Sequence, residues 1–229
     1  SVLGADRAAV FVVPATGHGD TRLWLVDPAD PGVSVRPRRL LDRSRSVADV
    51  QLDAAPATLL DVSADVILHQ AALRAAVLVA ADALGAARRM LEMAVAYSKE
   101  REQFGVPVGS FQAVKHAAAT MLVDVESTRS VVYFAASSVD LALPEAALHA
   151  AAAKAQTTAA AARVADSALT VHGAIGYTYE YDLQLFYKRA KLDRELFGSP
   201  VVWNERIATA LRLAPDVRLP EPQPERATA

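Results

Sequence analysis

The sequence lacks cysteine, a strong excess of charge of either sign and a long uninterrupted apolar run. Without cysteine there are no disulfides, thiolate metal ligands or cysteine nucleophiles, which fits a reducing cytoplasm. The net charge of −2 gives no basic field that would attract nucleic acid. Arg74, Asp82 and Lys154 interrupt the most apolar stretches, residues 71–84 and 146–162, so no membrane span is expected.

The first 60 residues contain short segments rich in β-branched and aromatic side chains, separated by turn residues. Strands are predicted at residues 8–13, 21–26, 33–35 and 47–52. Four short strands from one meander rarely form a stable domain alone. We therefore interpret residues 1–62 as part of a β domain and expect further β sequence before Ser1.

From about Asp65 onward, apolar residues recur at spacings of three and four, which is the helical period. The predicted helices are 65–102, 110–141, 144–173, 182–191 and 200–213. Long helices joined by short turns favour an antiparallel bundle of the four-helix type. The sequence thus predicts a mainly α fold with a β part. Its divisions are a partial β-sheet domain at 1–62, a helical bundle at 63–213 and a flexible tail at 214–229.

The break between the first two long helices reads REQFGVPVGSFQ, residues 101–112. Its Arg101 offers a fork of donors that suits a diphosphate, and the face of Phe104 can lie against a purine. The segment could also be an ordinary interhelical turn, with Arg101 as a surface charge, Phe104 in the core and Gly105 ending the helix. A second segment, VHGAIGYTYE at 171–180, lies at another helix end, where backbone N–H groups can approach anionic oxygens.

Together, in this order and at this separation, the two segments resemble the C-terminal half of the flavin-dependent acyl-CoA dehydrogenase family. That family's pattern is RxQFGxxxxxFQ followed by a Gly-Gly-x-Gly-Tyr/Phe element, and the resemblance covers nearly the whole chain. It implies an acyl-CoA substrate and FAD shared between subunits of a homo- or hetero-oligomer, with electron-transfer flavoprotein as a candidate acceptor. The residues implied to contact FAD are Arg101, Gln103, Phe104 and Gln112 in the first motif, and His172, Gly173 and Ala174 in the second. Ala174 departs from the pattern because it replaces the second glycine.

The resemblance also implies where the catalytic carboxylate, which removes the α-proton of the thioester, should lie. This chain has no carboxylate at either expected position. In most relatives this Glu lies 21 residues beyond the last glycine of the second motif, where this chain has Phe197. In a minority it lies about 26 residues before the arginine of the first motif, which here is Ala75. Both positions therefore lack a carboxylate, although a shift of the alignment by two residues would bring Glu195 to the first position.

Four interpretations remain open at this point. Glu195 is the base, or the chain is the non-catalytic member of a heteromeric acyl-CoA dehydrogenase such as those of bacterial steroid side-chain breakdown. The chain could also be a flavin monooxygenase of this fold, which needs no α-proton base, or an oligomerisation scaffold. We favour a FAD-associated subunit that lacks its own catalytic Glu. No metal site is predicted, because His69 and His149 lack ligand spacing.

Overall fold

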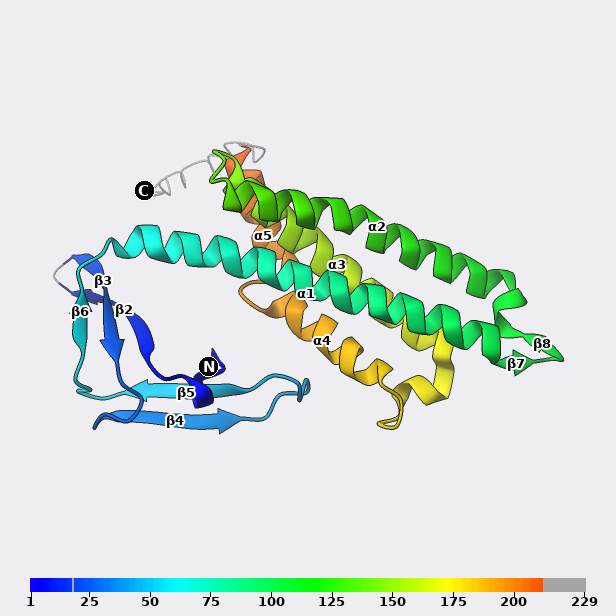
Figure 1. Ribbon diagram of the computed structural model, residues 1–229, viewed down its shortest axis with the longest axis horizontal. Helices are drawn as coiled ribbons and strands as arrows, with labels where there is room; N and C mark the ends of the chain where they lie inside the picture. Colours follow the sequence, from blue (N-terminus) through cyan, green and yellow to red (C-terminus); the bar gives the residue numbers. More distant parts are fainter. Residues whose placement is uncertain (18, 212–229) are drawn as a thin grey trace, which may run out of the picture.

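The computed structural model describes residues 1–17 and 19–211, which form a small β part and a bundle of long helices (Figure 1). The strands are β1 (Val2–Leu3), β2 (Phe11–Gly17), β3 (Asp20–Val26), β4 (Val33–Arg38), β5 (Val47–Leu52), β6 (Thr58–Leu60), β7 (Glu102–Gln103) and β8 (Val106–Pro107). The helices are α1 (Ala64–Glu100), α2 (Gln112–Asp140), α3 (Ala146–His172), α4 (Leu183–Glu195) and α5 (Pro200–Ala210). The predicted mainly α fold with a β part is confirmed.

The β part consists of two antiparallel sheets, ordered β1-β5-β4 and β2-β3-β6. Its buried core is small and is made by Ala5, Phe11, Val26 and Ala48. The sequence analysis missed β1 and β6, which have only two and three residues. Both are strands because a neighbouring strand supplies hydrogen-bond partners, and such long-range pairing leaves no periodicity in a segment this short.

The bundle is built on small side chains that let helices approach closely. Ala76, Ala80 and Ala83 on α1 have no exposed surface, and neither do Ala153 and Ala161 on α3. Larger side chains such as Met90, Met121 and Leu183 fill the remaining space. Burial of this apolar surface is the main source of bundle stability.

The helix bounds differ from the predicted ones by a few residues. Helix α2 begins at Gln112 because residues 108–110 form a separate 3₁₀ turn. Helix α4 continues to Glu195, about one turn beyond the predicted end at Lys191. The chain changes from strand to helix between Leu60 and Ala64, while the domain division at 62/63 stays a prediction. The predicted tail at 214–229 lies outside the described residues.

By length and composition alone, α1 could cross a membrane, since its most apolar window has a mean hydropathy of 1.5. A core helix passes the same test, and α1 buries one face against the rest of the bundle. Within residues 1–17 and 19–211, no group of three or more His, Asp or Glu side chains could hold a metal ion.

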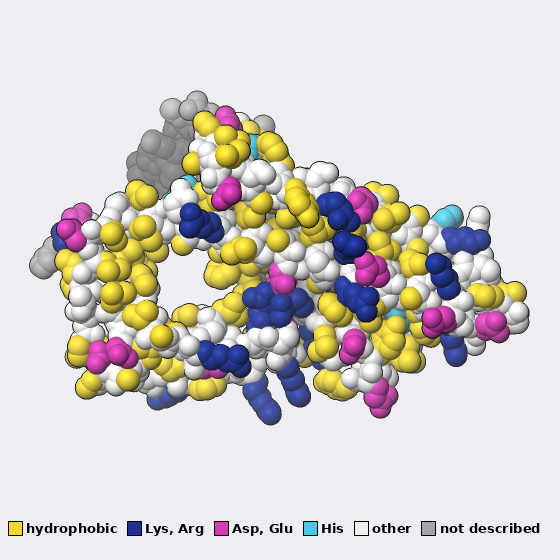
Figure 2. Space-filling model, in the orientation of Figure 1, with side chains coloured by type: hydrophobic (Ala, Val, Ile, Leu, Met, Phe, Trp, Pro, Cys, Tyr) yellow, Lys and Arg dark blue, Asp and Glu magenta, His cyan; other side chains and the backbone are white. Residues whose placement is uncertain are grey.

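The β part and the bundle meet on one side of an open space (Figure 2). At that junction Arg189 of α4 donates to Asp42 of the β4–β5 loop at 2.8 Å and to Asp82 of α1 at 2.8 Å. Arg45 of the same loop also pairs with Asp82 and lies 3.7 Å from Asp193. These five side chains, here named the junction cluster, connect the loop to two helices.

Candidate functional site

The RxQFG segment forms a short hairpin that projects from the end of α1. Strands β7 and β8 pair through Glu102–Pro107 and Gln103–Val106, and the turn between them is Phe104-Gly105. Both turn residues have positive φ, 56° and 79°, as a tight two-residue hairpin requires. A phenylalanine at positive φ is strained, and this one is 93% exposed. The structure therefore excludes the ordinary-turn interpretation in which Phe104 fills the core.

The hairpin is held firmly against α1. The Arg101 N–H donates to the Tyr97 carbonyl at 2.8 Å, and the Val108 N–H donates to the Arg101 carbonyl at 2.7 Å. A Cβ on Gly109 would come within 2.8 Å of the Ser98 carbonyl oxygen, so only glycine permits this approach. The position of Arg101 is consequently fixed by the backbone on both sides.

The second motif forms the end of α3 and the turn that follows. Gly173 has a φ of 62°, which a residue with a side chain would adopt only with strain. A Cβ on Gly176 would lie 3.0 Å from the Leu169 side chain and 3.1 Å from the His172 Cβ. The two glycines thus let the chain reverse tightly beyond His172, which leaves the backbone after the helix accessible.

The two motifs converge on a pair of adjacent cavities. The first, of about 460 Å³, is bordered by Arg101 and Gln103 from the hairpin and by His172, Gly173 and Ala174 from the end of α3. The second, of about 530 Å³, is bordered by Gln103 and mostly apolar groups, among them Phe104 and Phe111. Residues shared by both cavities are Gln103, Val108, Thr170 and Val171.

Six of the seven predicted FAD-contacting residues therefore border one surface; the exception is Gln112. It is the exposed first residue of α2 and lines neither cavity. Sequence reasoning missed Tyr97, Val108, Thr170 and Val171. Helical spacing could have indicated Tyr97, because it lies one turn before Arg101.

His172 borders the first cavity but its ring is engaged inside the protein. The residue is 3% exposed, with Nδ1 2.7 Å from the Ala168 carbonyl and Nε2 3.2 Å from the Tyr181 hydroxyl. Burial lowers the pKa of His172 below its ordinary value. Because both ring nitrogens are engaged within the protein, a ligand at this position would contact the backbone rather than the ring.

None of the positions considered for the base is a poised buried carboxylate. Phe197 has a positive φ of 55°, is 54% exposed and lies in the turn after α4; Ala75 is half-buried on α1. Glu195 is exposed and pairs with Arg194 at 3.4 Å. The turn at Phe197 is held by Trp203, whose Nε1 donates to the Phe197 carbonyl at 3.2 Å.

Buried ionisable groups lie beside this turn instead. The Lys154 ammonium has no exposed surface and donates to the Gly198 and Asp193 carbonyls at 2.9 and 3.1 Å. Burial lowers the pKa of Lys154 to about 8. Asp193, also fully buried, has its pKa raised to about 7 by burial and by the nearby Asp82. Neither group borders the two cavities of the motifs.

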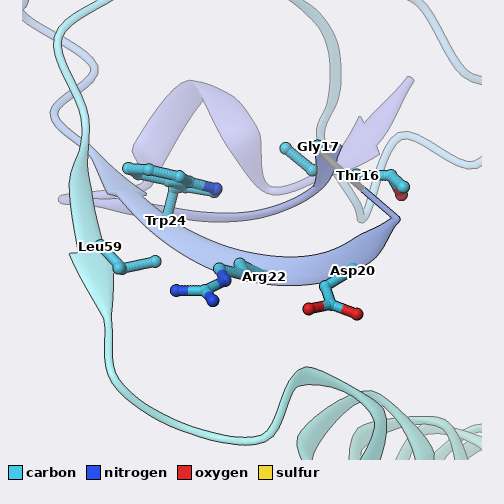
Figure 3. A pocket seen from close by; sticks show the side chains of 7 residues that line it. Thr16, Gly17, Asp20, Arg22, Trp24 and Leu59 are labelled. Carbon is cyan, nitrogen blue, oxygen red and sulfur yellow. The ribbon is translucent and has the colours of Figure 1, made fainter.

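A separate cavity of about 390 Å³ lies on the β2-β3-β6 sheet, beside Trp24 and Leu59 (Figure 3). Its polar rim comes from Thr16, Asp20 and Arg22. The sequence analysis did not anticipate it, because the residues come from strands that are brought together only by the sheet.

Comparison with known proteins identifies the family that carries the two-motif site. The family described as acyl-CoA dehydrogenase, C-terminal domain, matches residues 66–211, which include both motifs, all but the first two residues of α1, and α2 to α5. This chain belongs to the acyl-CoA dehydrogenase family. The members of the family are FAD-dependent oxidoreductases.

Individual relatives show how much of a typical family member the chain represents. It is 39% identical to acyl-CoA dehydrogenase FadE34 of Mycobacterium tuberculosis over 93% of this chain and 29% of that protein. It is similar to the Tcur3481-Tcur3483 steroid ACAD G363A variant, with 28% identity and a TM-score of 0.81 over 92% of this chain and 57% of that one. The ChsE4-ChsE5 complex of Mycobacterium tuberculosis gives 29% identity and a TM-score of 0.81 over 91% and 57%. The chain thus spans less than a third of FadE34 and little more than half of these two solved chains.

Proposed function

We propose that this chain is a FAD-associated subunit of an acyl-CoA dehydrogenase assembly and that it does not supply the catalytic carboxylate. The observation that supports the proposal is the convergence of Arg101, Gln103 and Phe104 with the Gly173 turn on two adjacent cavities. One cavity has a guanidinium and accessible backbone at its border, and the other is mostly apolar. A dinucleotide has the matching parts, a diphosphate and a purine.

The residues present fit FAD as the ligand of this surface. The Arg101 guanidinium can pair with the pyrophosphate, and the backbone beyond α3 can donate to its other oxygens. Phe104 and Phe111, whose rings meet edge to face at 6.2 Å, can contact the adenine. Bound FAD would supply hydride acceptance from the β-carbon of the acyl thioester. We assign the chain's own role to holding the nucleotide half of the cofactor.

The proposed assembly contains a second chain that removes the α-proton. Phe197 and Ala75 cannot accept a proton, and the exposed Glu195 is paired with Arg194. The names of two similar solved structures, a ChsE4-ChsE5 complex and the Tcur3481-Tcur3483 steroid ACAD, pair two different chains. We therefore propose a heteromeric assembly whose FAD sites lie between chains, with a steroid-derived acyl-CoA as the substrate class and electron-transfer flavoprotein as a candidate electron acceptor.

Replacing Arg101 by Ala tests the cofactor assignment. It removes charge-assisted hydrogen bonds worth about 1.5–3 kcal/mol each, so FAD affinity of the assembly should fall by about one to two orders of magnitude in an equilibrium titration. Arg88→Ala is the matched control, because Arg88 lies on α1, the helix that Arg101 directly follows, and pairs only with Glu92 within the described residues. Equal FAD affinity of the two variants would show that this motif does not hold the cofactor.

A further inference from the structure

Three aromatic rings pack against one another behind the first cavity, each from a different segment around it. Tyr97 lies one turn before the end of α1, His172 is the last residue of α3, and Tyr181 lies just before α4. The His172 ring stacks on Tyr97 with centroids 4.7 Å apart and meets Tyr181 at 5.0 Å. Tyr97 and Tyr181 are 6.5 Å apart, edge to face. We name these three residues the ring triad.

Hydrogen bonding fixes the chemical form of the central ring. The Ala168 carbonyl can only accept, so Nδ1 of His172, 2.7 Å away, carries the proton. In the neutral ring Nε2 is then an acceptor, and the Tyr181 hydroxyl donates to it at 3.2 Å. A neutral imidazole with one tautomer is the form that satisfies both partners in this buried position.

The ring triad is connected directly to both halves of the site. The Tyr97 carbonyl accepts the backbone N–H of Arg101 at 2.8 Å, and Gly173 follows His172 in the chain. Arg101 and Gly173 border the same cavity although they follow different helices, α1 and α3. The stacked rings of Tyr97 and His172 therefore link the two residues that border this cavity.

We propose that His172 is a positioning residue, which holds the ends of α1 and α3 together through Tyr97 and Tyr181 so that Arg101 and the Gly173 backbone engage one ligand. The identity of that ligand as FAD rests on the proposed function. The positioning itself rests on the stacking, the two hydrogen bonds and the burial of the ring.

Protonation of His172 should weaken the arrangement, since the charged ring is buried and can no longer accept from Tyr181. The charged groups that act on Tyr181 are Arg89 and Glu100 on α1 and Asp182 before α4, and the Ala168 carbonyl on α3 accepts from His172. The Met93 backbone on α1 also hydrogen-bonds the imidazole and, like the Ala168 carbonyl, favours the charged ring, but burial outweighs both. Burial already lowers the pKa of His172, so the loss is expected on the acid side of its ordinary value of 6.5.

The experiment compares His172→Phe and Tyr181→Phe with Tyr179→Phe in the assembly that the full chain forms. Tyr179 is 71% exposed and two residues from Tyr181, so its variant removes the same hydroxyl from a ring outside the triad. FAD is the probe, because its pyrophosphate stays fully charged between pH of about 7.5 and 5, where a histidine titrates. Affinity is measured across that range, and hydrogen exchange is followed at the Arg101 and Gly173 amides.

The wild type and Tyr179→Phe should lose about tenfold in FAD affinity as the pH falls from about 7.5 to about 5. His172→Phe should bind FAD weakly at every pH and should show no such pH dependence. Tyr181→Phe should speed exchange at both amides by about fivefold to tenfold. The Tyr181→Phe variant also tests the positioning role if His172→Phe does not fold. The positioning role is overturned if Tyr181→Phe matches Tyr179→Phe in both exchange and pH profile. If Arg101→Ala leaves FAD affinity unchanged while the Tyr181→Phe amides exchange faster, the proposed ligand is wrong and the positioning role stands.

Discussion

At the scale of single residues, Phe104 is the hairpin position that packing within its own chain explains least. A bulky side chain at φ 56° is strained, and at 93% exposure it gains almost nothing from burial within its own chain. Strain of this kind persists where surrounding structure enforces it and is common at ligand sites. The neighbouring Gly105, with a φ of 79°, carries no such penalty.

Phe104→Gly distinguishes a role of this side chain in protein stability from a role in FAD binding. Glycine relieves the strain, so the free energy of unfolding should stay unchanged or rise by up to about 1 kcal/mol in urea titrations. FAD affinity of the assembly should fall about fivefold to tenfold, because an aromatic contact is lost. A destabilisation above about 2 kcal/mol would instead show that the ring packs as part of the fold.

At the scale of elements, the junction cluster joins the β4–β5 loop to α1 and α4. The pKa of Asp82 is lowered, because the hydrogen bonds from Arg189 and Arg45 and the neighbouring Asp193 outweigh the effect of burial. Asp193 is fully buried and its carboxylate oxygens have no close hydrogen-bond partner at ordinary geometry within the described residues. Of the two acids, Asp193 therefore holds its proton more tightly, since Asp82 is the one that is hydrogen-bonded to both guanidinium groups.

Replacing Asp193 by Asn tests this protonation state. The folded pKa of about 7 exceeds the ordinary value of 3.8, so the folded protein keeps a proton that the unfolded chain releases. The stabilising contribution is complete below 3.8 and is lost as the pH rises through about 7. Relative to wild type, Asp193→Asn should therefore gain about 2–4 kcal/mol in free energy of unfolding between the acid and alkaline ends of that range. Parallel urea midpoints of the two proteins at every pH would contradict a raised pKa.

At the scale of the whole molecule, the chain covers only part of the length of the solved chains that it matches. The bundle carries the two cavities to which our proposal assigns the nucleotide, while the β part has a small core and lies across an open space from much of the bundle (Figure 2). The matched solved chains are longer, and this chain covers 57% of two of them. The remaining contacts to flavin and acyl thioester are therefore assigned by our proposal to other polypeptide.

Anaerobic flavin bleaching by a panel of acyl-CoA thioesters tests that assignment. The chain alone should bind FAD weakly and should not bleach it, because a missing base costs about 10² to 10⁴ in rate. Bleaching should appear when a dehydrogenase partner that supplies a Glu is added, and Glu195→Gln should leave it unchanged.

Other outcomes of the same experiment identify the alternatives. Bleaching by the chain alone that disappears in Glu195→Gln would establish a homomeric enzyme with Glu195 as its base. Oxygen-dependent product formation from reduced flavin, without any bleaching, would indicate a monooxygenase. Stoichiometric FAD in the chain purified alone would contradict the shared site.

The sequence by itself determined the mainly α fold with its β part, the approximate helix bounds and the two motif segments that meet at the site. These follow from local properties: helical periodicity, turn residues and short motifs whose residue types and order indicate their chemistry. Tertiary structure alone decided that Gln112 lies off the cavities and that the His172 ring points inward to Tyr97 and Tyr181. It also placed Asp42 beside Arg189, 147 residues away, and buried Asp193 next to Asp82. Side-chain direction, burial and long-range ion pairs depend on how helices rotate and pack against each other, and a one-dimensional pattern does not contain that information.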